Sequence, residues 1–356
     1  MKFRGIFLFI LILLLSCIKP FEPVVKQGDI RLVVDGRITN LPGPYVVTIA
    51  YSGNYTKDVT GVPDYITGAY VCINDDQGNC EELTEISRGT YATRKDGIRG
   101  VIGRSYYIEI RPHIGNTYRS IPETILPPPP IQRMYYQYNP GTIFKKNGFD
   151  VYIEFKDPVE EKNYYKWETI GWYQYSLDCW KKVYDPSPFN LISDKRFNGQ
   201  HVTGVYLVTA PYNSRMPYVV DGYQLALTSS AYEFLENLKK QVSITGSIFD
   251  PPPTFIRGNI YNVDNPDNIA LGYFYSAGAA EQGIAIDRTQ VIESPENYIT
   301  LLPKPLYCGD PCDMNCVIFG GGTCGTEPCP PECNNLPDMS YIPPDAWPLF
   351  YKRCDE

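Results

Sequence analysis

Residues 30–39 read IRLVVDGRIT, and their apolar side chains recur at every second position. This alternation is typical of a β-strand with one buried face. The positions concerned are Ile30, Leu32, Val34 and Ile38. The same period continues in residues 47–51 and 106–110, and the turn-forming sequences NLPGP, GNYTKD and RKDGIRG lie between these runs. We therefore expect residues 30–126 to form an immunoglobulin-like β-sandwich.

Four consecutive prolines at residues 127–130 end this region. Proline cannot donate to a β-ladder and favours a stiff extended chain, so we place a domain boundary and linker there. Alternating apolar residues resume at 151–155 and 165–169. They predict a second β-sandwich spanning residues 131–302.

The sequence SSAYEFLENLKKQ at residues 229–241 has the apolar period of a helix rather than a strand. Ser230 and Glu233 have the spacing of a capping box, in which each side chain accepts a backbone N–H of the first turn. We expect a helix near residues 231–242 that packs on a sheet through one apolar face. That face consists of Ala231, Phe234, Leu235, Leu238 and Val242.

The amino terminus has the pattern of a lipoprotein signal peptide. Two basic residues precede an unbroken apolar run over residues 6–15, which is too short to cross a bilayer as a helix. The run ends in LLSC, which resembles a bacterial lipobox, where the cysteine is acylated and becomes the new amino terminus. We expect residues 1–16 to be the signal peptide, Cys17 to carry a membrane anchor, and residues 17–29 to be a tether. An ordinary secretory signal that contains a cysteine is the alternative.

Ten cysteines remain besides Cys17, an even number in a chain expected to enter an oxidising compartment. Cys72 and Cys80 flank the turn sequence INDDQGN, and we expect them to bridge a hairpin. The other eight are also expected to form disulfides, with the pairing left open, and most lie in an irregular tail at residues 303–356. They are Cys179, Cys308, Cys312, Cys316, Cys324, Cys329, Cys333 and Cys354. A metal cluster is the alternative, but the spacings are mostly too long and no histidine is nearby.

The charge balance and the scarcity of histidine argue against several function classes. Lys and Arg number 32 against 40 Asp and Glu, a net charge of −8, which makes a nucleic-acid role unfavourable. The two histidines, His113 and His201, offer little general-base or metal chemistry. A G-x-G-x-x-G match at residues 320–325 lies in the cysteine-rich tail rather than between a strand and a helix. We expect no enzymatic activity, no cofactor and no bound metal.

Aromatic residues gather in residues 167–180. Trp167 continues an alternating strand, so we expect it in the sandwich core. The following segment reads as a loop, where tyrosine and tryptophan offer large contact area at low entropic cost. We interpret its aromatics as a contact surface for a partner, with burial in the core as the open alternative. The candidates are Trp172, Tyr173, Tyr175 and Trp180.

Several segments together resemble one protein family. They are VVDGRIT, the tetraproline run, SSAYEFLENLKKQ, GSIFDPPPTFIRGNIYN, LGYFYSAGA and the cysteine-rich end. The family is domain of unknown function 4249 (DUF4249), found in Bacteroidota. The resemblance implies a lipoprotein of the outer membrane encoded beside a TonB-dependent transporter, and it supplies no catalytic residues.

Three classes of function fit these observations. The first is a lipid-anchored accessory protein of the outer membrane that helps a TonB-dependent barrel capture or admit a ligand, and we favour it because of the resemblance. The second is a structural or adhesive pilin-like subunit assembled by strand addition. The third, a β-sandwich hydrolase, lacks a convergent set of catalytic groups. The ligand and the face of the membrane stay undecided.

Overall fold

The computed structural model describes residues 30–52, 64–143, 145–159, 162–176, 179–184, 189–243, 256–292 and 339–340. The described chain is mainly β. The expected signal peptide, the tether, Cys17 and the seven cysteines from Cys308 to Cys354 lie outside the described residues. None of the described helices is long and apolar enough to cross a membrane.

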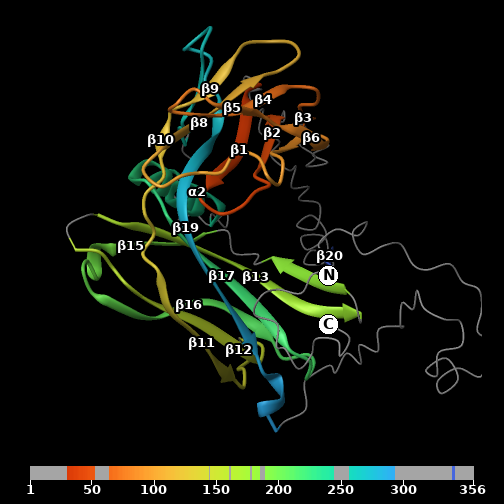
Figure 1. The fold of residues 1–356 in the computed structure, drawn as a ribbon, viewed down its shortest axis with the longest axis vertical. Helices are drawn as coiled ribbons and strands as arrows, with labels where there is room; N and C mark the ends of the chain where they lie inside the picture. The colour runs from red at the N-terminus through yellow and green to blue at the C-terminus, as the bar shows by residue number, and fades with distance from the viewer. Residues whose placement is uncertain are drawn as a thin grey trace, which may run out of the picture.

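The chain up to the proline run forms short strands in the upper part of Figure 1. They are β1 (Leu32–Thr39), β2 (Val46–Tyr51), β3 (Asp64–Tyr65), β4 (Tyr70–Asp75), β5 (Cys80–Glu82), β6 (Thr84–Ser87), β7 (Thr90–Ala92), β8 (Ser105–Arg111), β9 (Tyr118–Ser120) and β10 (Glu123–Thr124).

The described residues after the proline run form both long and short strands, one α-helix and two short 3-10 helices. They are β11 (Ile131–Asn139), β12 (Gly148–Lys156), β13 (Tyr164–Ser176), β14 (Cys179–Tyr184), β15 (Asn190–Ser193), η1 (Asp194–Arg196), β16 (His201–Pro211), β17 (Tyr218–Ala226), α2 (Ser229–Val242), β18 (Ile260–Asn262), β19 (Leu271–Ile286), η2 (Arg288–Gln290) and β20 (Met339–Ser340).

One strand, β19, belongs to both halves of the molecule. Its first part pairs in parallel with β1, and its second part, from Gly278 onward, pairs antiparallel with β17. The resulting sheet has the order β20-β14-β13-β17-β19-β1-β2-β7-β6, and Figure 1 shows β19 running from the upper to the lower half. Two smaller sheets, β18-β9-β8-β4-β5 and β11-β12-β16, pack against it to close the two halves.

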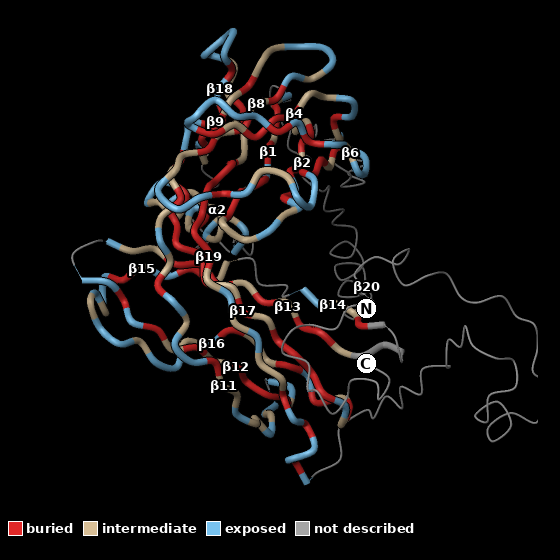
Figure 2. The backbone as a smooth tube through the Cα atoms, viewed as in Figure 1, coloured by how far each residue is buried: buried red, intermediate tan, exposed pale blue. Residues whose placement is uncertain are grey.

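Each half has its own apolar core, visible as the buried segments in Figure 2. The upper core packs Val34 and Ile108 from the amino-terminal strands against Ile260 and Phe274 from β18 and β19. The lower core contains Trp167, which is 2% exposed, so its predicted place in a core is confirmed.

The expected division into residues 30–126 and 131–302 differs from the structure. The upper half also contains β18 and the first part of β19, which follow the lower half in sequence. Parallel pairing needs a long connection, and no local sequence signal marks which distant strand will provide it.

The proline run crosses β19 where that strand changes partner. A side chain at Gly278 would collide with the carbonyl oxygen of Leu126, so only glycine lets the two backbones approach this closely. The buried amide of Gln224 donates to the Pro129 carbonyl at 2.8 Å and accepts from the Trp167 indole at 3.0 Å. The prolines therefore form a linker in contact with both halves rather than a free spacer.

The helix begins two residues earlier than expected and has a different cap. Thr228 is the N-cap, and its Oγ1 accepts from the Ala231 N–H at 3.2 Å. The predicted capping box of Ser230 and Glu233 is therefore wrong, because the Ser230 hydroxyl instead donates to Glu123. Ala231 and Leu235 pack on the sheet as predicted, whereas Val242 is 66% exposed at the end of the helix.

The hairpin of β4 and β5 carries a disulfide between Cys72 and Cys80, which confirms that predicted bridge. Asp75 shapes the turn, since its Oδ1 accepts from the backbone N–H groups of Gln77 and Asn79 at 2.9 and 2.8 Å. The Arg104 guanidinium also reaches Asp75 at 2.6 Å. These donors explain the presence of Asp75 in INDDQGN, because its carboxylate holds the turn together.

A charged cluster ties the two halves on the face of the large sheet that carries α2. Arg37 of β1 holds Glu168 of β13 through two hydrogen bonds, one of them 2.6 Å long, and Lys166 lies 2.7 Å from the same carboxylate. Burial alone would raise the pKa of Glu168, but the charges and hydrogen bonds of Arg37 and Lys166 outweigh it and lower the pKa to about 2. Glu168 is therefore ionised wherever the protein is folded near neutral pH.

We expect Glu168→Gln to lower the free energy of unfolding at pH 7 by about 2 kcal/mol, because it leaves Lys166 and Arg37 without their carboxylate. The loss is below that of a fully buried pair, since Glu168 is 25% exposed. A depressed pKa stabilises the fold above the unfolded value of 4.5, so the difference should shrink as the pH falls from 4.5 toward 2. Urea unfolding across this range measures it.

Glu154→Gln is the matched control, because Glu154 makes only a 3.7 Å ion pair with the exposed Arg133. It should change stability by less than about 0.5 kcal/mol. Equal effects of the two substitutions would contradict the assigned role of Glu168.

Candidate functional site

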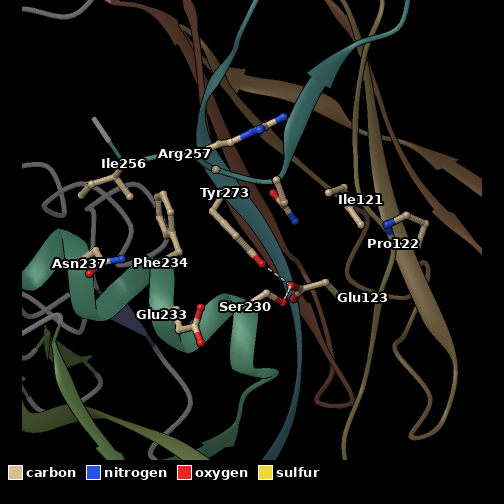
Figure 3. A pocket seen from close by; sticks show the side chains of 12 residues that line it. Ile121, Pro122, Glu123, Ser230, Glu233, Phe234, Asn237, Ile256, Arg257 and Tyr273 are labelled. Carbon is tan, nitrogen blue, oxygen red and sulfur yellow. Dashed lines mark hydrogen bonds between the residues drawn. The ribbon is translucent and has the colours of Figure 1, made fainter. Parts of the chain in front are cut away.

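A cavity of about 450 Å³ lies where α2, β10, β19 and residues 256–259 meet (Figure 3). Its volume is within the range of small-ligand sites. One wall comes from the upper half of the molecule and the facing wall from α2. The lining residues are Ile121, Pro122, Glu123, Ser230, Glu233, Phe234, Asn237, Ile256, Arg257, Gly258, Asn259 and Tyr273.

Glu123 is the buried acid of this cavity, with a relative exposure of 6%. Its Oε1 accepts from three hydroxyl groups: Tyr273 of β19, Ser230 of α2 at 2.9 Å and Thr228 at 3.1 Å. Figure 3 shows the side chains of Ser230 and Tyr273 meeting at the carboxyl of Glu123. Glu123 thereby fastens the start of α2 to β19 and β10.

The other oxygen of this carboxyl, Oε2, is buried and receives no hydrogen bond of good geometry from the described residues. Burial raises the pKa of Glu123, and the hydrogen bonds from Tyr273, Ser230 and Thr228 lower it only in part. Burial and then the neighbouring Glu123 charge also raise the pKa of Tyr273, so its phenol stays a hydrogen-bond donor. Glu123 thus binds a proton more tightly in the folded chain than in water.

The walls of the cavity combine an aromatic pair with a polar rim. The Phe234 and Tyr273 rings lie 4.8 Å apart between centroids, at an angle of 34°. Glu233, Asn237 and Arg257 are exposed at the rim. Apolar walls with a few convergent polar groups are the usual composition of a binding pocket.

The described lining offers hydrogen bonds and shape but no recognisable nucleophile and base. It contains neither histidine nor cysteine. The hydroxyl of Ser230 donates to the Glu123 carboxyl, and no described lining residue adds the histidine of a serine–histidine–acid arrangement. This arrangement suits the binding of a small molecule better than hydrolysis.

The predicted contact surface lies in strands, so the expected loop is wrong. Trp172 and Tyr173 are in β13, and Trp180 is in β14, with the two strands paired as a hairpin. Tyr175 and Cys179 also lie in these strands, but their side chains are outside the described part of the structure. The alternation of large and polar residues within 172–182 could have indicated these paired strands.

Within this hairpin, the tryptophans are buried rather than presented to a partner. Trp172 and Trp180 are 9% and 7% exposed and pack against Val219 of β17. The Trp172 indole donates to Asp221 at 2.6 Å. Tyr173 points to the opposite side of the sheet and packs against the lower core. The structure therefore does not bring Trp172 and Tyr173 together on one surface.

Sequence reasoning missed Glu123. It stands alone in SIPETIL, outside any periodic run and distant from its partners, Ser230 and Tyr273, along the chain. Ser230 was singled out for a helix cap, and Tyr273 only as part of a strand. An isolated acid between a proline and an apolar run was the one local signal, and it is a weak one.

A comparison with protein families identifies the relationship. The model of the family described as domain of unknown function (DUF4249) matches residues 18–283, which is more than half of the chain. The chain belongs to the DUF4249 family. The resemblance predicted from the sequence motifs is thus confirmed. A search among curated proteins finds no match.

The matched range of the DUF4249 protein includes every residue of the cavity. It also includes the shared strand β19 up to residue 283. The cysteines from Cys308 onward fall beyond it. The features that build the cavity are therefore within the part of the chain that carries the family relationship.

For Glu123→Gln we expect a pH dependence opposite to that of Glu168→Gln. A raised carboxyl pKa gives stability that is present below the unfolded value of 4.5 and is lost as the pH rises through the folded pKa. Glutamine mimics the protonated acid, so the variant and the wild type should be similar near pH 4. Above that pH the variant should gain stability relative to the wild type.

Thermal unfolding at intervals from pH 4 to pH 8 measures this difference, with Glu233→Gln at the exposed rim as the control. Parallel curves for the wild type and Glu123→Gln would show that the Glu123 pKa is not raised in the folded protein.

Proposed function

We propose that this DUF4249 protein is a lipid-anchored binding protein of the outer membrane that works beside a TonB-dependent transporter in capturing or admitting a ligand. The observation that carries the proposal is the cavity at Glu123, a ligand-sized space where the two halves of the β region meet. Its lining favours recognition over catalysis, so the protein acts without enzymatic activity.

The location of the cavity supports a role in ligand handling. Its walls come from β10 on one side of the proline linker and from α2 and β19 on the other. Binding sites lie preferentially where modules meet, because side chains from several elements converge there. A ligand in this cavity would contact both halves of the chain and so stabilise their relative arrangement.

The membrane anchor is the second part of the proposal. The apolar run over residues 6–15 and the LLSC sequence favour acylation of Cys17. Several acyl chains on one residue hold a protein on a bilayer durably. The remaining cysteines of residues 303–356 would pair as disulfides in the oxidising compartment beyond the inner membrane, and each half of the β region would be an immunoglobulin-like sandwich.

We expect metabolic labelling with an alkynyl palmitate to mark the wild-type protein and to be absent from Cys17→Ser. The reason is that the thiol of Cys17 is the acylation site. In-gel fluorescence after click coupling measures the label, and fractionation should place the labelled protein with the outer membrane. Undiminished labelling of Cys17→Ser would contradict the anchor.

The binding role can be tested by blocking the cavity. Asn237→Trp places a large ring at the rim, so it should reduce by at least about tenfold the small molecules that native mass spectrometry finds on the purified protein. Lys240→Trp is the matched control, since Lys240 is exposed on the same helix and is not part of the lining. Ligand occupancy that is equal in both variants would exclude the cavity as the binding site.

Purification from detergent extracts of the outer membrane tests the proposed transporter partner. Affinity purification of the wild-type chain should recover a TonB-dependent barrel identified by mass spectrometry. If repeated extractions in mild detergent recover the lipoprotein alone, the transporter part of the proposal fails.

A further inference from the structure

A row of three tyrosines crosses the outer side of the sheet β11-β12-β16. Tyr135, Tyr152 and Tyr206 are opposed to one another on neighbouring strands. Their neighbours Val151 and Ile153 are fully buried in the lower core, so the alternation of β12 turns Tyr152 away from that core. Tyr206 is 44% exposed. The row therefore lies on the outside of the molecule, on a different sheet from the cavity.

The three rings hold one another in place. The Tyr135 and Tyr152 centroids are 5.4 Å apart with an interplanar angle of 23°, and Tyr206 meets Tyr152 edge to face at 5.9 Å. The Arg133 guanidinium lies 4.8 Å from the Tyr135 centroid, and the Lys145 amine lies 5.2 Å from that of Tyr206. Rings that are already ordered lose little entropy when a ligand binds.

Hydrogen-bonding groups lie along both sides of the row. On one side, Arg133 is 3.7 Å from Glu154. On the other side, Asp150 accepts from Lys145 at 2.8 Å and from Thr209 at 2.6 Å. Each cation is matched by a carboxylate, so the flanks offer donors and acceptors without a net charge.

We propose that this tyrosine row is a binding platform for a neutral glycan. A sugar ring presents C–H groups that pack on aromatic rings and hydroxyls that both donate and accept hydrogen bonds. The row and its flanks provide those two kinds of contact side by side. Strands lie about 4.8 Å apart, so a row across three strands is about 10 Å long and suits a short stretch of linked sugars.

The balance of charge favours a neutral glycan over charged ligands. Nucleic acids and anionic lipids are bound by unmatched Lys and Arg, whereas Arg133 and Lys145 both have carboxylate partners. This inference assigns a neutral glycan to the tyrosine row. It does not depend on the cavity at Glu123.

The test uses the full mature protein in detergent and four neutral probes: cellohexaose, maltohexaose, xylohexaose and mannohexaose. At least one should bind in isothermal titration calorimetry. Tyr152→Ala, which removes the central ring, should weaken that binding by about tenfold or more. Tyr152→Phe should retain most of it, because the ring remains.

Tyr261→Ala is the control, since Tyr261 is 43% exposed, close to the 44% of Tyr206, but lies on β18. It should leave the affinity unchanged. Circular dichroism and thermal unfolding show whether each variant is folded. If Tyr152→Ala is not, Tyr206→Ala takes its place, because it removes the exposed ring at the end of the row.

The inference is overturned if none of the four probes binds the wild type. It is also overturned if a probe binds Tyr152→Ala and the wild type with the same affinity. If no probe binds and Tyr152→Ala abolishes recovery of the transporter, the row is a protein-docking surface instead. A failed glycan test with a transporter still recovered leaves the proposed function intact, so the two proposals fail separately.

Discussion

The parallel pairing of β1 with the first part of β19 is the constraint on which the rest of the molecule depends. It places Val33 beside Leu271 and so brings the two ends of the described β region into one sheet. At Gly278 the same strand turns to β17, and the proline linker crosses it there in a contact that a side chain would prevent. Because β19 pairs with β1 in one half and with β17 in the other, it joins the two halves in one sheet beside the cavity.

A half-buried acid, Glu168, and a buried acid, Glu123, illustrate opposite uses of a carboxylate at this joint. Glu168 is surrounded by Arg37 and Lys166, and their charges outweigh the cost of burial. Glu123 is held by neutral hydrogen-bond donors and has no cation beside it among the described residues, so burial prevails and raises its pKa. The first arrangement holds β1 to β13 by ion pairs at neutral pH. The second places a carboxyl with a raised pKa beside a ligand-sized cavity.

The tyrosine row follows from the way in which the lower core is built. Side chains alternate between the two faces of β12, and Val151 and Ile153 fill the core. Tyr152, which lies between them, must therefore face outward. Tyr135 on β11 and Tyr206 on β16 are the residues paired with Tyr152, so the three rings line up across three strands. The register that gives the core its packing thus also creates the exposed aromatic surface.

The sequence alone predicted the β class, the helix after residue 228, the bridge between Cys72 and Cys80, the core position of Trp167 and the family, because each rests on local periodicity, short spacing or a motif. It did not determine the boundaries of the two halves or the burial of Trp172 and Trp180, since these depend on which distant strands pair. Glu123, Ser230 and Tyr273 form one site only because β10, α2 and β19 meet in the folded chain. Such a site has no periodic signature: its members are far apart in sequence, and only the tertiary structure removes the water between them and makes their hydrogen bonds and shifted pKa values possible.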